Sequence, residues 1–375
     1  MATWQVDQLG VGSFLRRAVA AGLAPGFVAL AARDGESGPV WCAGSTGIGG
    51  GPASPDLAYD LASLTKPLAT VTLLLLARRD GLALETRLGE VIPELAGSAW
   101  DGVTLLECAT HTAGFPAWEP LYARRAAGEQ DYVGALRGLA PVAAPGTGVV
   151  YSCPGFIALG LALERAGGAG LAVMFEELIA EPLGLSGELR FAPPAGSDVA
   201  AGEREWFVER ALLAERGIAG EPPLGPPGVA PCDDGNARGA GGAAGNAGLF
   251  GTAAAVARLA AEYLPGGGTL LDADEAAIAV RDHTPGLEQA RGLGWQLAST
   301  AGCSAGPALP PDAFGHTGFT GTSVWVNAHA RGVHVLLGNR LHPGGRAPDL
   351  HPLRRRFHRL ASAALERAGG EDGDT

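Results

Sequence analysis

Ser63 and Lys66 are the residues whose types and spacing most directly suggest chemistry. They lie in "YDLASLTKPLATVTLLLLARRDG", residues 59–81, which otherwise reads as an apolar helix. Residues three apart share one face of a helix, so the two side chains would stand side by side. A serine hydroxyl is a weak nucleophile that needs a neighbouring base, and desolvation can lower the pKa of a lysine enough for it to help. The pair predicts catalysis by an activated serine.

The position of the pair supports this interpretation. In the first turn of a helix, the Ser63 N–H is one of the unpaired donors at the positive end of the helix dipole. Lys66 is the only lysine in the sequence. Because arginine does not deprotonate, one retained lysine indicates a role that arginine cannot fill. The alternative is that Ser63 caps the helix and Lys66 is a surface residue, and the S-x-x-K spacing alone does not decide between them.

Two further segments could complete such a site. "PGTGVVYSCPGFIALG", residues 145–160, places Tyr151 just before a helix, where a tyrosine near a cation could move the serine proton; a core tyrosine is the alternative. "FGHTGFTGTSVWVN", residues 314–327, puts small residues before a strand, so its backbone can approach a ligand closely. A free N–H here and that of Ser63 would form an oxyanion hole, where losing one donor typically costs about 3 kcal/mol.

The two ends of the chain contain the β-signals and the middle is mostly helical. The strands expected at the ends are residues 27–33, 40–44, 292–299, 320–327 and 332–340, with a closing helix at 349–369. We predict an α/β (α+β) fold in which residues 1–60 and 286–375 form an antiparallel sheet flanked by helices. Residues 61–285 would form an inserted, mostly helical domain with a long Gly/Pro-rich loop at 216–247.

Composition excludes several classes of protein. The 375 residues carry a net charge of -12, without the basic face that nucleic acid requires, so we expect no nucleic-acid partner. The five cysteines show no metal-binding spacing, and no metal or cofactor is expected. Arg16-Arg17 resembles an export signal, but Pro25-Gly26 interrupts the apolar stretch that follows. We expect a helix, a turn and a strand there, hence a cytoplasmic protein with no membrane partner.

Together the motifs resemble the serine β-lactamase and penicillin-binding-protein superfamily. The similarity is greatest to its class C-like branch, which includes β-lactamases, D-specific peptidases and family VIII carboxylesterases. "LLECATHTAGFP", "GGAAGNAGLFGTAAAVARLA" and "GNRLHP" resemble further motifs of this branch, so the resemblance covers nearly the whole chain. It implies a β-lactamase/transpeptidase-like fold and acyl transfer to water through an acyl-serine.

The resemblance also implies a role for individual residues. Ser63 would be the acylated nucleophile, Lys66 would assist its deprotonation, and Tyr151 would be the general base. The backbone N–H groups of Ser63 and Phe319 would form the oxyanion hole. The residues implied to contact or face the substrate are Cys153, His316, Thr317, Gly318, Asp234 and Asn236.

Three departures from the family pattern bear on the substrate. Cys153 stands where β-lactamases carry Asn, and a thiol is a poor donor and acceptor. His316 stands where they carry Lys, and a neutral imidazole attracts a β-lactam carboxylate less than an ammonium does. Asn246 replaces the common His. We therefore expect a carboxylic ester or small amide as substrate. A β-lactamase or D-amino-acid peptidase, and a non-hydrolytic acyl- or peptidyl-binding protein, are the alternatives.

Two other signals are set aside. "GCSAG" around Ser304 matches G-x-S-x-G, but that motif requires a following helix, and "PALPPD" cannot form one. The seven histidines other than His316, among them His111, are expected to be structural or surface residues because none shows metal-ligand spacing.

Overall fold

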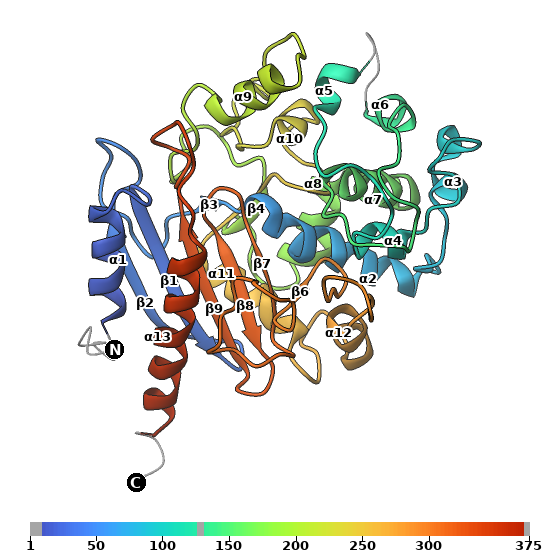
Figure 1. Ribbon diagram of the computed structural model, residues 1–375. Helices are drawn as coiled ribbons and strands as arrows, with labels where there is room; N and C mark the ends of the chain where they lie inside the picture. The colour runs from blue at the N-terminus through green and yellow to red at the C-terminus, as the bar shows by residue number, and fades with distance from the viewer. Residues whose placement is uncertain (1–9, 126–130, 371–375) are drawn as a thin grey trace.

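The computed structural model describes residues 10–125 and 131–370, and its framework is a six-stranded antiparallel sheet (Figure 1). The strand order is β2-β1-β9-β8-β7-β6. The strands are β1 (Gly26–Arg33), β2 (Glu36–Gly44), β6 (Gln296–Leu297), β7 (Phe314–Thr317), β8 (Ser323–Asn327) and β9 (Gly332–Gly338). Both ends of the chain therefore contribute to one sheet, which confirms the predicted fold class.

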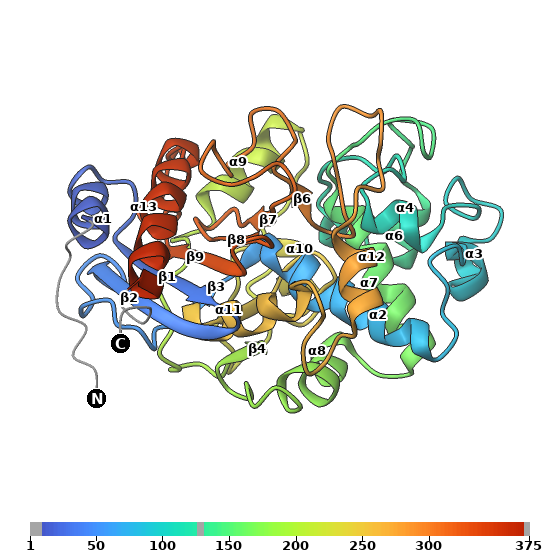
Figure 2. The ribbon, with the colours of Figure 1, turned by 90° about the horizontal axis from the view of Figure 1, so that it is seen from below.

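Strand β1 is buried along almost its whole length because helices cover both faces of the sheet. Phe27 and Ala29 pack under α1 (Val11–Ala20) and α13 (His351–Gly370), which lie side by side on one face (Figure 2). Val28 and Leu30 point to the opposite face and join the main core, on the side covered by α11 (Ala253–Ala260). The alternation follows from the two-residue period of a strand.

The rest of the described chain is mostly short helices, which lie beside the sheet in Figure 1. They are α2 (Thr72–Arg79), α3 (Leu88–Val91), α4 (Leu105–Ala109), α5 (Leu121–Arg124), α6 (Val133–Arg137), α7 (Cys153–Gly167), α8 (Leu171–Phe175), α9 (Phe207–Glu215), α10 (Gly235–Gly239) and α12 (Ala273–Val280). The 3-10 turns are Ala62–Leu64, Pro93–Leu95 and Ala261–Tyr263, and the π-helical segments are Lys66–Val71 and Glu176–Ala180.

Strand pairing adds details that residue patterns did not predict. A second sheet joins β3 (Tyr59–Asp60), β5 (Leu249–Gly251) and β4 (Leu189–Phe191), each too short to give a periodic signal. In the large sheet, β7 is a strand of its own where only small residues before a strand were expected. The division into domains at residues 61 and 286 stays a prediction; α11, which lies between those limits, packs on the large sheet.

Within the described ranges, none of the helices taken alone has the length and apolar character needed to cross a membrane. One pair of helical segments joined by a bend, Cys153–Gly167 and Leu171–Ala180, has that length and apolar composition when the two are counted together.

Candidate active site

Ser63 lies in the tight turn that joins β3 to the helix of Lys66. Ala62, just before it, has a left-handed backbone with φ 47°, a conformation that costs energy outside glycine. The Asp60 carboxylate accepts the Ala62 N–H at 2.8 Å and holds this conformation in place. The hydroxyls of Thr320 and Thr322 donate to the carbonyls of Asp60 and Leu61 at 2.7 and 3.1 Å. The turn that carries Ser63 is thus fixed to the β7–β8 turn, which carries Phe319.

Lys66 is fully buried and its ammonium points at Ser63. Its Nζ donates to Ser63 Oγ at 2.9 Å and to the Asn246 carbonyl at 3.0 Å, and it lies 3.6 Å from Cys153 Sγ. The three-residue spacing therefore places the two side chains together as predicted. Burial lowers the pKa of Lys66, but Cys153, Tyr151 and Asp234 outweigh burial and raise the pKa above its ordinary value. The expectation of a lowered lysine pKa is wrong: the acidic neighbours keep Lys66 a cation.

Tyr151 stands between this lysine and two imidazoles. Lys66 Nζ lies 5.0 Å from the centre of its ring, and the His111 and His316 rings lie 4.5 and 5.7 Å away. The His111 carbonyl accepts the Val150 N–H at 2.9 Å, and His111 Nδ1 accepts the Ser152 N–H at 3.0 Å. His111 therefore holds the backbone on both sides of Tyr151, and it is part of the Tyr151 environment rather than a residue remote from the site.

His316, Thr317 and Gly318 form the end of β7 and the residue after it. His316 is buried, and burial together with the Lys66 charge places its pKa well below the usual range, so its imidazole is neutral at pH 7. A Cβ at Gly318 would lie 2.0 Å from Thr322 Oγ1, so only glycine fits there. These residues support the site, but none of the three is among those that line the cavity at Ser63.

The backbone donors predicted for an oxyanion hole are free. In the part of the chain that the structure describes, neither the Ser63 nor the Phe319 N–H donates to a protein acceptor. Both residues line the same cavity. Arg340 Nε donates to the Phe319 carbonyl at 2.8 Å, which fixes the Phe319 peptide while half of the side chain stays exposed. This arrangement can receive a carbonyl oxygen that becomes negatively charged.

The cavity has a volume of about 300 Å³. Its lining residues are Ala62, Ser63, Ala117, Trp118, Tyr151, Cys153, Glu203, Val208, Glu209, Leu212, Asp233, Asp234, Ala247, Phe319 and Thr320. Four of them are carboxylic acids, and only Glu209 has an ion-pair partner within the described ranges, Arg238 at 2.5 Å. Burial raises the pKa of Asp233 to about 6 and that of Glu209 to about 7. The cavity therefore has four carboxyl groups along an otherwise mainly apolar lining.

Asp234 and Asn236 have different surroundings. Asp234 lines the cavity, caps α10 through the Ala237 N–H, and accepts from Asn246 Nδ2 at 3.0 Å. Asn246 therefore connects Asp234 to Lys66. Asn236 is fully buried; its side chain accepts the Leu121 N–H and donates to the Glu119 carbonyl. Its amide anchors a neighbouring loop and does not line the cavity.

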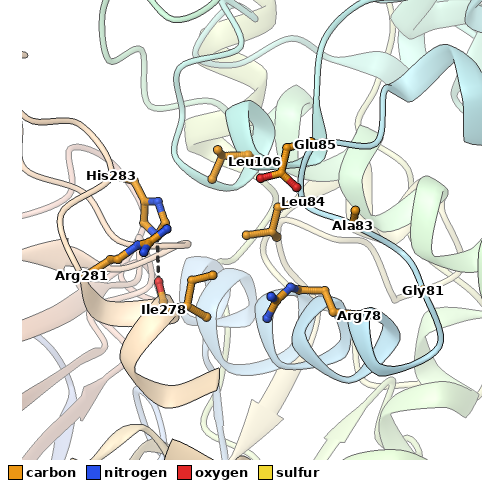
Figure 3. Close-up of a pocket in the computed structure, with 9 residues that line it drawn as sticks. All are labelled: Arg78, Gly81, Ala83, Leu84, Glu85, Leu106, Ile278, Arg281 and His283. Carbon is orange, nitrogen blue, oxygen red and sulfur yellow. Dashed lines mark hydrogen bonds between the residues drawn. The ribbon is translucent and has the colours of Figure 1, made fainter. Parts of the chain in front are cut away.

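Neither Ser304 nor the hollow between α2 and α12 provides a competing site. Ser304 is buried and its Oγ accepts the indole N–H of Trp325 at 3.2 Å, so it has no access to a substrate. The hollow contains no nucleophile among its lining residues (Figure 3). There His283 Nε2 lies 2.7 Å from the Ile278 carbonyl. Among the described residues, no group of His, Cys, Asp or Glu side chains is arranged to hold a metal ion.

Sequence reasoning missed several residues around the site. Asp60 lies three positions before Ser63, so a polar residue beside the nucleophile motif was a usable signal. Glu203 and Asp233 meet at the cavity only through folding; Asp233 accepts the Glu203 N–H at 2.6 Å. No local pattern identifies them. His111 lies in "THTAGFP", a segment that resembles a family motif, but its contact with Tyr151 depends on its left-handed backbone, φ 63°.

Known proteins resemble this chain in sequence and in fold. The model of the family described as Beta-lactamase matches residues 14–358. A putative D-alanyl-D-alanine carboxypeptidase of Escherichia coli (strain K12) is 27% identical over 329 residues, 80% of this chain and 73% of that protein. Esterase EstB of Burkholderia gladioli is 32% identical over 185 residues, 43% of this chain and 45% of that protein. The structure of EstCE1, a hydrolase with promiscuous acyltransferase activity, superimposes with a TM-score of 0.72 at 22% identity, covering 93% of this chain and 97% of EstCE1.

Proposed function

The chain belongs to the Beta-lactamase family of serine hydrolases, and from this premise we propose that it hydrolyses small carboxylic esters or amides through an acyl-serine on Ser63. The observation that carries the proposal is the 2.9 Å contact of Lys66 Nζ with Ser63 Oγ, in a cavity that Tyr151 also lines. A buried cation at a serine hydroxyl stabilises negative charge on that oxygen, which is what a nucleophile requires.

The residues divide the proton chemistry between them. Because Lys66 stays charged, it stabilises the serine oxygen without accepting its proton, and Tyr151 takes that proton as Ser63 Oγ attacks the carbonyl carbon. The N–H groups of Ser63 and Phe319 receive the carbonyl oxygen. As the C–O or C–N bond breaks, Tyr151 returns the proton to the leaving group. In the second half Tyr151 takes a proton from water as the water oxygen attacks the acyl carbon. The bond from that carbon to Ser63 Oγ then breaks, Tyr151 returns the proton to Ser63 Oγ, and the acid leaves.

Three features of the cavity and its surroundings favour an ester over a β-lactam or a peptide with a free carboxylate. Glu203, Asp233 and Asp234 place acidic groups along the wall, which disfavours an anionic substrate. His316 is neutral, so it offers such a substrate no charge in return. Cys153 offers a weak donor where an amide-binding Asn is expected. A β-lactamase or D-amino-acid peptidase with the same mechanism is the second candidate, and the relatedness to a putative D-alanyl-D-alanine carboxypeptidase supports it.

Parallel assays with p-nitrophenyl butyrate and nitrocefin test the substrate class, with Ser63→Ala as control. We expect ester turnover that the variant loses, and little nitrocefin hydrolysis. Strong nitrocefin turnover would establish the second candidate instead. A non-hydrolytic binding protein would turn over neither compound, and a fluorophosphonate probe would leave Ser63 unlabelled by mass spectrometry. An adduct on Ser63 therefore excludes the binding protein even where both assay substrates are poor ones.

We also propose a cytoplasmic location. The support is that Val11 and Leu15 of α1 pack into the core beside the sheet, so the Arg16-Arg17 segment is an integral helix of the fold. Cell fractionation with antibody detection tests this location, and recovery of the protein in an exported fraction would contradict it.

A further inference from the structure

We propose that Arg291 is a positioning residue for catalysis: its guanidinium is the second permanent cation at Tyr151, and it stabilises the negative charge that Tyr151 carries in the turnover cycle. The inference rests on the proposed function, because it concerns how the base of that reaction is prepared.

The structure places the Arg291 side chain against the tyrosine and shields it from water. Its Cζ lies 5.7 Å from the centre of the Tyr151 ring, and only 5% of the residue is exposed. The backbone is fixed on the strand-like segment that leads to β6. The Arg291 N–H donates to Thr284 Oγ1 at 2.9 Å, and Arg291 forms a bridge with Gln296. The guanidinium therefore approaches Tyr151 from a different element than Lys66 does.

The guanidinium lacks an ordinary counter-ion. Nη2 donates to Gln289 Oε1 at 2.5 Å, and Nε is buried without a partner in the described part of the chain. No described carboxylate forms an ion pair with it. Burial lowers the pKa of Arg291 to about 10, which is still well above neutral, so the guanidinium stays charged at pH 7. A buried cation beside the ring attracts negative charge on the phenol oxygen.

The other groups that face Tyr151 cannot supply this charge. His111 and His316 are buried, and burial with the nearby cations places the pKa of each imidazole well below its usual range. Cys153, which approaches Lys66 from α7, has its pKa raised by burial, and a cysteine carries no positive charge in either protonation state. Asp234 acts on Lys66 and carries the opposite sign. Lys66 and Arg291 are therefore the two positive charges at the ring.

The pH dependence of kcat/KM with p-nitrophenyl acetate, an uncharged ester, tests the proposal. In Arg291→Gln we expect the rising limb to move to higher pH by about one to two units, with activity falling about tenfold or more at pH 7 and recovering at alkaline pH. Arg291→Lys retains the charge and should keep the limb close to its original position. Arg281→Gln, an exposed arginine ten positions earlier, is the matched control and should change nothing.

Ultraviolet titration of the phenol supplies a readout that requires no turnover. The difference between the unaltered protein and Tyr151→Phe isolates the signal of Tyr151, and Arg291→Gln should move that signal to higher pH. An unmoved signal, or a rate lost equally at every pH, would overturn the proposal and leave Arg291 a structural residue. If the protein hydrolyses no ester, the proposed function fails. The titration still tests the role of Arg291 in that case, because it needs no turnover, and a Tyr151 signal that moves in Arg291→Gln would support that role.

Discussion

The surroundings of Ser63 comprise two sets of charged residues with opposite character. The Tyr151 cluster (Tyr151, Lys66, His111, Arg291 and His316) combines two permanent cations with two neutral imidazoles. The acidic group, consisting of Asp60, Glu203, Glu209, Asp233 and Asp234, supplies the wall of the cavity and the support beneath it.

The two sets differ in how they are held. In the first set, each cation lies near a group that would carry negative charge in the proposed reaction, Lys66 at Ser63 Oγ and Arg291 at the Tyr151 ring. In the acidic group, Asp60 accepts the Asp233 N–H at 2.6 Å, and the charge of Asp233 adds to burial in raising the pKa of Asp60 to about 7. We expect those carboxyl groups that remain ionised along the cavity to disfavour an anionic substrate. We infer that the Tyr151 cluster determines rate and that the acidic group determines which substrate enters.

The largest expected effect comes from breaking the Tyr151 cluster at its shortest contact. Lys66→Arg keeps the charge but cannot reproduce a single ammonium that contacts Ser63 Oγ, the Asn246 carbonyl and Cys153 Sγ in a fully buried space. We expect kcat for ester hydrolysis to fall about 10³-fold, the scale of losing one preorganised electrostatic contact to a reacting oxygen. Steady-state kinetics on p-nitrophenyl butyrate measures this. Arg78→Lys on the adjoining helix α2 is the control, and near-normal turnover in Lys66→Arg would show that charge alone suffices.

The pH dependence of stability should have opposite signs in the two sets. The folded state binds a proton at Asp60 near pH 7, whereas the unfolded chain does so only near pH 4, so acidification through this window stabilises the fold. His316 behaves in the opposite way: the unfolded chain binds a proton near pH 6.5 and the buried imidazole does not, so acidification destabilises the fold.

Urea unfolding at pH 8 and pH 5.5 measures this difference. We compare the free energy of unfolding of each variant with that of the unaltered protein at the two pH values. As the pH falls, this free energy should decrease in Asp60→Asn and increase in His316→Gln relative to the unaltered protein. Each change should be about 1–3 kcal/mol, the scale of one to two pKa units. Circular dichroism gives the midpoints, and Asp274→Asn, at a residue whose side chain lies outside both sets, is the control. If the free energy of unfolding changed with the same sign in both variants, the pH dependence of stability would not differ in sign between the two sets.

The sequence predicted the Tyr151 cluster better than the acidic group, and the reason is physical. Ser63 and Lys66 are joined by helical spacing, and Tyr151 precedes a helix, so local geometry and family motifs locate all three. The large antiparallel sheet was predictable for the same reason, because its longer strands have clear apolar runs. The direction in which the pKa of Lys66 shifts could not be predicted, since it depends on neighbours that only the folded chain brings together.

The acidic group illustrates what local patterns cannot supply. Glu203 and Asp233 come from irregular segments thirty residues apart, and nothing in their spacing indicates a shared cavity wall. Asn236 shows the opposite case, a residue that a motif identifies but that does not reach the cavity. The D-x-N pattern suggested a substrate contact, but the side-chain amide is hydrogen-bonded to backbone groups of residues 119–121. Motif similarity locates a residue along the chain, while the partners of its side chain decide whether it faces the substrate.

Weakening the acidic group should alter selectivity more than rate. Glu203 is buried at the cavity with one hydrogen bond, from the Val208 N–H at 2.7 Å, and no described ion pair. In Glu203→Gln we expect kcat/KM for an ester with a carboxylate in its acyl chain to rise about 5–10-fold relative to its uncharged analogue, because one repulsive charge is removed. Glu205→Gln, exposed and two positions away, is the matched control. An unchanged ratio would show that Glu203 does not discriminate against anions.

The smallest expected effect lies where the two sets meet, at Cys153. Its sulfur is 3.6 Å from Lys66 Nζ and it lines the cavity, but it offers a substrate amide little in the way of a donor. Cys153→Asn supplies a carboxamide that can accept from Lys66 and donate to an acyl-amide carbonyl, so the ratio of nitrocefin to ester hydrolysis should rise about 3–10-fold, the value of one added hydrogen bond. Cys153→Ala removes the thiol without adding a donor and should leave the ratio unchanged.

A rise in both variants would mean that space, not hydrogen bonding, limits β-lactams. No rise in either would assign the discrimination to the acidic wall and the neutral His316, and the double variant Cys153→Asn/Glu203→Gln would then show whether the carboxylates exclude the lactam before the amide can act.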